Sequence, residues 1–234
     1  TAPEEISVNP PAAADIWEDP EDGVPSTRSV EEVLAELDAM TGQPELKAQV
    51  RKLVAQVKLN KRREEAGLKG ASAALHMVFS GPPGTGKTMV ARLVAELFTA
   101  LEVLPNGKLI EVDRSDLISS HVGGTEEKPT AAIESALGGV LFIDESYALT
   151  GGGGNDFGKQ AVETLLKALE DRRGEFVCIA AGYTDEMHDF LDANPGLASR
   201  FTRVIDFEPY SPAELVEIGV SMAAASDNVL DQPG

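Results

Sequence analysis

The chain has little cysteine: Cys178 is the only one among its 234 residues. A single thiol cannot form a disulfide within the chain, so we expect a reducing, cytoplasmic setting. Because Cys178 lies inside the apolar run 176–181, we interpret it as a packed strand residue rather than a nucleophile.

Basic residues are scarce as well, with 20 Lys and Arg against 39 Asp and Glu and a formal net charge of −19. A chain this acidic repels phosphate backbones, so we expect no nucleic-acid partner. The basic run Lys58, Lys61, Arg62 and Arg63 is a local exception. We interpret it as a solvated helix face or a contact between subunits.

Long hydrophobic runs are missing too. No apolar stretch approaches the roughly 20 residues that cross a bilayer, so we expect no direct membrane insertion, and no signal peptide is visible. Residues 1–28 are rich in Pro, Ala, Asp and Glu, which predicts an acidic linker with Trp17 inside it. A linker at the start indicates that the chain is a piece of a longer protein.

One segment matches the phosphate-binding loop pattern G-x-x-x-x-G-K-[ST]. An apolar stretch, 75–79, precedes it and a helix-patterned stretch, 89–98, follows it. Glycines let backbone N–H groups face a phosphate, and the helix N-terminus adds partial positive charge. We expect Lys87 to reach the phosphates of ATP and Thr88 to hold Mg²⁺. The predicted nucleotide-binding residues of this segment are Gly81, Pro82, Pro83, Gly84, Thr85, Gly86, Lys87, Thr88 and Met89.

Apolar segments alternate with helical patterns along the rest of the chain. The predicted strands are 75–79, 108–112, 139–143, 175–181 and 203–207. Capping-box patterns at Ser29 and Ser211 predict two of the helix starts. Strands that alternate with helices predict an α/β fold of three layers, in which helices cover both faces of a five-stranded parallel sheet.

Two carboxylates follow the strand at 139–143. A strand that ends in Asp144 and Glu145 delivers them to the edge of the sheet beside the phosphate-binding loop. We expect Asp144 to hold Mg²⁺ and Glu145 to polarise the water that attacks the γ-phosphate.

An arginine precedes the last strand in the segment Ser199-Arg200-Phe201-Thr202-Arg203. The planar fork of an arginine matches phosphate oxygens. We expect Arg200 to act in trans, on the nucleotide of a neighbouring subunit, with Arg203 as the second candidate. Such an arginine finger is worth about 10³–10⁵ in rate.

These motifs, in this order, resemble those of an AAA+ ATPase. More narrowly, the segments 138–149 (GGVLFIDESYAL), 181–183 (AGY) and 194–197 (NPGL) resemble the CbxX/CfqX group. Within that group the chain is most similar to the EccA ATPases of type VII (ESX) secretion. The segments that carry this likeness are 120–126 (SHVGGTE), 155–158 (NDFG) and 200–203 (RFTR).

The resemblance implies a ring of subunits, a hexamer, that hydrolyses ATP between neighbouring subunits. It implies that His121, Val122 and Gly123 line the central pore and grip a polypeptide, and that Thr41 and Gly42 contact adenine. Tyr183 and Thr184 stand at the sensor position, where AAA+ proteins usually hold Asn.

The resemblance also implies a division of the chain. Residues 29–208 would form the AAA+ nucleotide-binding domain, and 209–234 the start of a helical lid that is truncated before its sensor arginine. ATP hydrolysis by the chain alone is then expected to be slow.

From these motifs we expect an ATPase module of a type VII secretion component that remodels protein substrates or chaperone complexes. Two alternatives stay open. One is a remodelling ATPase similar to the red-type Rubisco activase, and the other is a scaffold whose assembly is gated by nucleotide. A DNA-handling machine is disfavoured by the charge.

Overall fold

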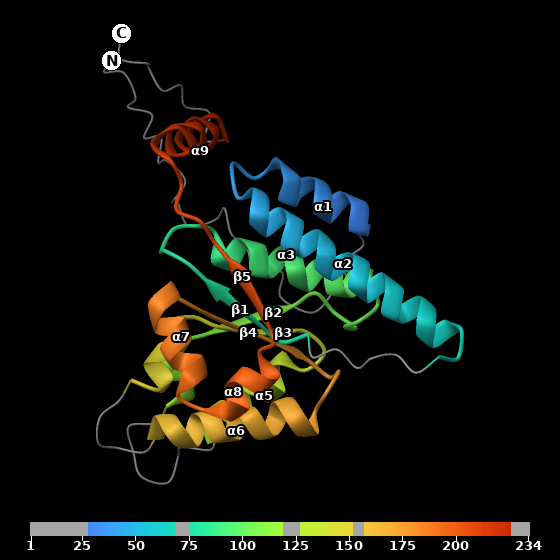
Figure 1. The fold of residues 1–234 in the computed structure, drawn as a ribbon, viewed down its shortest axis with the longest axis vertical. Coiled ribbons are helices and arrows are strands. Elements are labelled where there is room, and N and C mark those ends of the chain that lie inside the picture. The colour runs from blue at the N-terminus through green and yellow to red at the C-terminus, as the bar shows by residue number, and fades with distance from the viewer. Residues whose placement is uncertain (1–27, 69–74, 119–126, 152–156, 226–234) are drawn as a thin grey trace, which may run out of the picture.

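The computed structural model describes residues 28–68, 75–118, 127–151 and 157–225 (Figure 1). Its centre is one sheet of five strands, all parallel, in the order β2-β3-β4-β1-β5. The strands are β1 (Met77–Ser80), β2 (Leu109–Val112), β3 (Val140–Ile143), β4 (Val177–Gly182) and β5 (Arg203–Asp206). Each overlaps its predicted segment, and the predicted fold class is confirmed.

The three inner strands, β1, β3 and β4, are buried over their whole length. Complete burial is what a parallel sheet with helices on both faces requires. Ser80 at the end of β1 pairs with Gly182 of β4 on one side and with Asp206 of β5 on the other. The carboxyl ends of these strands therefore meet at one edge of the sheet.

Helices cover both faces of the sheet (Figure 1). On one face lie α1 (Val30–Ala39), α2 (Pro44–Glu65) and α3 (Lys87–Ala100), which share a core with Phe79 and Phe142. On the other lie α5 (Glu127–Ala136), α6 (Phe157–Asp171), α7 (Thr184–Asp192) and α8 (Pro195–Arg200), which share a core with Leu141 and Cys178. The short α4 (Arg114–Leu117) and the 3₁₀ turn η1 (Ser146–Leu149) follow β2 and β3.

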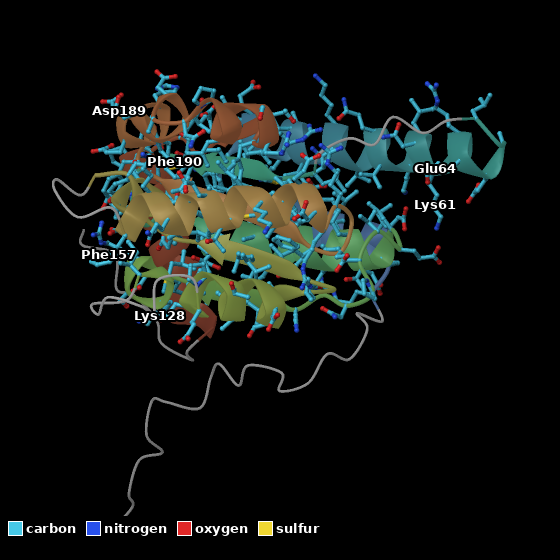
Figure 2. All side chains as sticks on the ribbon, turned by 90° about the horizontal axis from the view of Figure 1, so that it is seen from below. Lys61, Glu64, Lys128, Phe157, Asp189 and Phe190 are labelled. Atoms are coloured by element: carbon cyan, nitrogen blue, oxygen red, sulfur yellow. The ribbon has the colours of Figure 1, made fainter. Side chains whose placement is uncertain are left out.

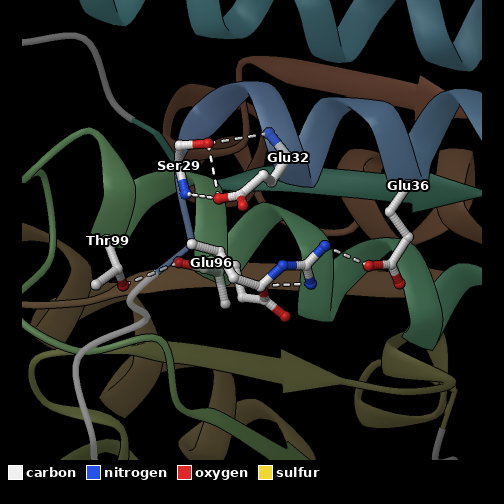
Figure 3. Close-up of polar contacts among 7 residues, drawn as sticks. Ser29, Glu32, Glu36, Glu96 and Thr99 are labelled. Carbon is white, nitrogen blue, oxygen red and sulfur yellow. Dashed lines mark hydrogen bonds and ion pairs between the residues drawn. The ribbon is translucent and has the colours of Figure 1, made fainter.

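The start of α1 shows how local sequence determines a helix boundary (Figure 3). Ser29 Oγ accepts from the Glu32 N–H at 3.2 Å, and the Glu32 carboxylate accepts from the Ser29 N–H at 2.7 Å. This is the predicted capping box. Just before it, Arg28 donates to Glu36 of α1 and to Glu96 of α3, at 2.5 and 2.9 Å, which ties the two helices together.

The last helix, α9 (Pro212–Ala225), begins after β5 and stands apart from both helix layers (Figure 1). The predicted cap is present, since Ser211 and Glu214 exchange hydrogen bonds at 2.7 and 3.3 Å. Several apolar side chains of α9 are exposed: Leu215, Val216, Val220 and Met222.

The basic run lies near the far end of α2, where Figure 2 shows Lys61 and Glu64 on the part that projects from the body. Lys58 pairs with Glu31 at 3.3 Å, and Lys61 pairs with Glu102. Among the described residues, no helix is both long and apolar enough to cross a membrane.

Candidate functional site

The segment from Gly81 to Gly86 forms a loop between β1 and α3. Gly81 N–H donates to Gly182 O of β4 at 3.1 Å, and Thr85 Oγ1 donates to Pro82 O at 2.8 Å, so the loop is held by the sheet and by itself. Gly84 and Gly86 have φ angles of 73° and 90°, in the left-handed region that favours glycine. Gly86 is the N-cap of α3, so the free N–H groups of that helix face the loop.

Lys87 lies folded against this loop. Its Nζ donates to Gly81 O and to Pro82 O, both at 2.8 Å. Burial lowers the pKa of Lys87, while the charges of Asp144 and Glu145 act in the opposite direction. The ammonium therefore lies between the loop carbonyls and the acidic pair, in a position where it could bind a phosphate oxygen.

A pocket of about 380 Å³ opens in front of the loop. It brings together nine of the predicted site residues from three parts of the sequence. Its lining residues are Pro83, Gly84, Gly86, Lys87, Thr88, Met89, Asp144, Glu145, Gly182 and Tyr183. Gly81, Pro82 and Thr85 lie in the loop itself and are not among the lining residues, and neither are Thr41, Gly42 and Thr184.

Asp144 and Glu145 reach the pocket from the end of β3. The Asp144 N–H donates to Val112 O of β2, which extends the sheet by one residue, and Asp144 Oδ1 accepts from the Glu145 N–H, both at 2.9 Å. Glu145 has a φ of 46°, an uncommon left-handed conformation for a residue with a side chain. That conformation turns the chain into η1 and leaves both carboxylates exposed at the pocket.

The donor set suits magnesium. Thr88 offers a hydroxyl and Asp144 a carboxylate, and Mg²⁺ typically takes one or two protein oxygens and completes its shell with water and phosphate. No group of three or more His, Cys, Asp or Glu able to hold a metal occurs in the part of the chain that the structure describes. A metal held largely by nucleotide and water is consistent with both observations.

At the predicted sensor position the pocket wall is aromatic. The Tyr183 ring centroid lies 5.9 Å from Lys87 Nζ, and the ring stacks on Tyr147 with centroids 5.7 Å apart. The pKa of Tyr147 is raised to about 12, first by burial and then by the charge of Glu145. Thr184 is the first residue of α7.

The segment predicted to contact adenine packs against the start of α9. Gly42 has a φ of 64°, and a Cβ placed there would lie 2.3 Å from Glu214 Oε1. Near it, the buried Gln43 side chain donates to Glu208 O at 2.7 Å and accepts from the Glu208 N–H at 3.1 Å. We name this pair of bonds the Gln43 clamp, and no motif in the sequence indicates it.

A second unpredicted contact reaches the phosphate-binding loop. Tyr210 donates its hydroxyl to Thr85 O at 3.3 Å. Its hydroxyl would lie 3.9 Å from a Cβ placed at Gly86. The residue just before the α9 cap is therefore bonded to the loop, and no short motif in the sequence signals this contact.

The structure places Arg200 at the opposite end of the sheet from Lys87. It ends α8 just before β5, and Arg203 at the start of β5 pairs with Met77 at the start of β1. Since a strand rises about 3.3 Å per residue, Arg203 lies roughly 13 Å before the level of Gly81. Arg200 precedes even Arg203 and lines a pocket with His76 and Phe176, so it lies far from Lys87 of the same chain.

The two candidate arginines bind helices on opposite faces of the sheet. Arg200 Nη2 forms an ion pair with Glu170 of α6, whereas Arg203 Nη2 donates to Gln56 Oε1 of α2 at 2.7 Å. Burial lowers the pKa of Arg203. Of the two, only Arg200 lies on the face formed by α6 and α8.

Several predictions concern residues outside the described ranges. These are the pore segment His121, Val122 and Gly123, and the linker up to residue 27 with Trp17. They stay predictions.

A phosphate-binding loop at the end of a central parallel strand, with paired carboxylates two strands along, is the arrangement of a P-loop nucleotide-binding protein. The chain belongs to the AAA family, since the model of the ATPase family associated with various cellular activities matches residues 77–209.

Among curated proteins the chain is 46% identical over 203 residues to stage V sporulation protein K of Bacillus subtilis, and 50% identical over 202 residues to the ESX-3 secretion system protein EccA3 of Mycolicibacterium smegmatis. It is 41% identical over 227 residues to the ESX-1 secretion system protein EccA1 of the same species. These matches cover 87%, 86% and 94% of the chain, and they confirm the resemblance to the EccA proteins.

The chain spans only part of these relatives: 63% of the sporulation protein, 33% of EccA3 and 39% of EccA1. Among solved structures, the AAA domain of FIGL-1 in complex with ADP matches with a TM-score of 0.56 at 19% identity, over 80% of this chain and 60% of that one. At this identity the match supports the fold alone.

Proposed function

We propose that this chain binds ATP with Mg²⁺ and hydrolyses it. The observation that carries the proposal is the convergence of Lys87, Thr88, Asp144 and Glu145 on one pocket from two distant segments. Lys87 would exchange its bonds to the loop carbonyls for phosphate oxygens, and the N-terminus of α3 would add its N–H groups. Thr88 and Asp144 would hold Mg²⁺, which neutralises charge on the phosphates.

Glu145 supplies the base in this proposal. Its exposed carboxylate stands at the pocket one residue beyond Asp144, where it can orient a water molecule toward the γ-phosphate and accept its proton. The left-handed backbone of Glu145 supports this role, because a residue held in an uncommon conformation is often one that function requires.

Hydrolysis would take place between copies of the chain. Arg200 lies too far from its own Lys87 to act on the same nucleotide, so it would serve the pocket of a neighbour in a ring, which we take to be a hexamer. Thr41 and Gly42 would contact adenine, Tyr183 with Thr184 would report on the γ-phosphate, and Arg203 would be the second candidate for the finger.

The cellular role we propose is the remodelling of protein substrates or chaperone complexes in the cytoplasm as part of type VII secretion. The identity to EccA3 and EccA1 supports it, and the His121 segment would grip the polypeptide. On this proposal residues 1–28 are a linker, 29–208 the nucleotide-binding domain and 209–234 the start of a lid.

The ATPase proposal is tested with Glu145→Gln in the full-length protein. General-base catalysis contributes about 10²–10⁴ in rate, so steady-state hydrolysis should fall at least a hundredfold while ATP still binds. Glu163→Gln is the matched control, since Glu163 is exposed on α6 away from the pocket. Normal turnover by Glu145→Gln would refute the role of Glu145.

The same assay separates an enzyme from a scaffold. A scaffold gated by nucleotide would bind ATP and assemble without steady-state turnover, with or without a candidate protein substrate. Absence of ATP binding by calorimetry in the wild-type protein would refute the nucleotide site itself.

A further inference from the structure

Three charged side chains meet where α6 ends beside α8. The Glu170 carboxylate pairs with Arg200 Nη2 and also with Arg173 Nη2, the latter at 2.8 Å. The side chains are 28% exposed for Arg200, 44% for Glu170 and 55% for Arg173, so the group lies at the surface. We call these three residues the Glu170 triad.

The triad borders a pocket of about 400 Å³ at the amino end of the sheet. Arg173 and Arg200 are the only charged residues among its lining, and its wall is otherwise largely apolar, with Leu169 and Phe176. His76, in the same wall, is held neutral near pH 7 because burial and then the charge of Arg200 lower its pKa to about 4. The triad with this wall therefore carries two positive charges and one negative charge.

If Arg200 serves a neighbour's nucleotide, Glu170 is a competitor. A carboxylate and a phosphate are both oxygen anions that accept from the same guanidinium fork. If Arg200 were the sole partner of Glu170, the carboxylate would lose its cation each time Arg200 bound the phosphate. The unpaired carboxylate would also place a negative charge close to that phosphate.

Arg173 changes this balance. It lies two residues beyond the end of α6, where its own ion pair with Glu170 at 2.8 Å keeps the carboxylate paired when Arg200 leaves. Because both ion pairs are exposed, each contributes only a factor of about two to five to an equilibrium. Exchange of Arg200 between Glu170 and a phosphate is then easily reversible.

We propose that Arg173 is a positioning residue for hydrolysis, which shares the Glu170 carboxylate so that Arg200 is available to the nucleotide of the neighbouring copy. This rests on the proposed role of Arg200 as the finger. Arg173 itself would touch no phosphate. Its effect would pass entirely through Glu170.

The test uses steady-state ATP hydrolysis by the full-length protein, with assembly checked by size-exclusion chromatography. Arg173→Ala should lower kcat about two- to fivefold with KM unchanged, since Glu170 then holds Arg200 alone. Arg173→Lys keeps a cation and should restore most of the rate. Arg172→Ala is the matched control, because Arg172 is the adjacent arginine and pairs with Glu175 at 3.7 Å.

The decisive variant is the double substitution Glu170→Gln with Arg173→Ala. Without the carboxylate, loss of Arg173 should have no effect, so the double variant should match Glu170→Gln alone. A purely structural role for Arg173 would instead lower the rate equally in both backgrounds, and that result would overturn the proposal.

Failure of this proposal and failure of the proposed function give different results. If Arg200→Ala hydrolyses ATP at the wild-type rate, the finger role is wrong, and the role of Arg173 falls with it. If Arg200→Ala is impaired but Arg173→Ala is not, the finger stands and only the role of Arg173 is refuted.

Discussion

A buried histidine should make the stability of this fold fall in mild acid. His76 precedes β1, is 4% exposed, and accepts a hydrogen bond at Nδ1 from the Cys178 N–H at 3.1 Å. Its ring lies against Phe176 and Phe201, with centroids 6.0 and 6.3 Å away. Burial first, and then the charges of Arg200 and Arg173, lower its pKa from 6.5 to about 4, although a backbone contact with Leu169 partly opposes this.

The direction and size of the effect follow from that pKa. Because the folded chain binds the proton less readily than the unfolded chain, the stability from His76 is complete above pH 6.5 and is lost as pH falls toward 4. At one pKa unit per 1.36 kcal/mol, the full loss is about 3 kcal/mol, of which roughly 2 kcal/mol is already gone at pH 5.

The assay compares the wild-type protein with His76→Asn in urea at pH 7.5, 6 and 5, followed by circular dichroism. Asn offers an acceptor near the position of Nδ1 but does not titrate in this range. Since other groups titrate in both proteins, the informative quantity is the unfolding free energy of the variant minus that of the wild type at each pH. That difference should rise by roughly 2 kcal/mol as the pH is lowered from 7.5 to 5.

The control is His188→Asn, since His188 is exposed on α7 and its variant should follow the wild type at every pH. If the wild type and His76→Asn lose stability in parallel, His76 is not kept neutral by the fold, and the reasoning is refuted.

Two further predictions concern contacts around the nucleotide pocket. Gln43→Ala leaves the N–H and C=O of Glu208 without their partners and should lower the unfolding free energy, measured in urea, by about 1–3 kcal/mol. Its control is Gln160→Ala, which changes a glutamine exposed on α6 and should cost little. Equal stability of the two variants would contradict the Gln43 clamp. Gly182→Ala would place a Cβ 2.7 Å from Tyr147 Cδ1 and 2.7 Å from Met187 Sδ and should cost about 1–3 kcal/mol in thermal unfolding. Its control, Gly219→Ala, has no atom within 4 Å of the added Cβ and should be neutral or stabilising; a Gly182→Ala protein as stable as that control would show that the ring of Tyr147 moves freely.

Much of the fold could be predicted because its signals are local. Apolar runs marked all five strands, and the caps at Ser29 and Ser211 marked two helix starts. Strand order could not be read in this way, because periodicity shows which residues are buried but not which strands are neighbours. The short α8 was missed although Asn194 caps it and Pro195 opens it, since six residues are too few for a helical period to stand out.

The residues of the candidate site also fall into two groups, those that a local sequence motif indicates and those that only the folded structure brings together. The residues of the phosphate-binding loop and the pair Asp144 and Glu145 could be proposed from the sequence, because each group is contiguous in it. The Gln43 clamp joins residues 165 positions apart, so only packing brings its partners together. The contact of Arg200 with Glu170 is likewise a product of how α6 packs on α8.

The burial of Cys178 has a practical consequence for measuring how copies of this chain assemble. The thiol is fully buried in β4, and that burial raises its pKa, so it is a poor nucleophile toward maleimides and similar reagents. Because the chain has no other cysteine, a cysteine introduced on an exposed helix face would be the single reactive thiol available to dyes or cross-linkers. Distances between copies could then be followed by fluorescence without removing the native thiol.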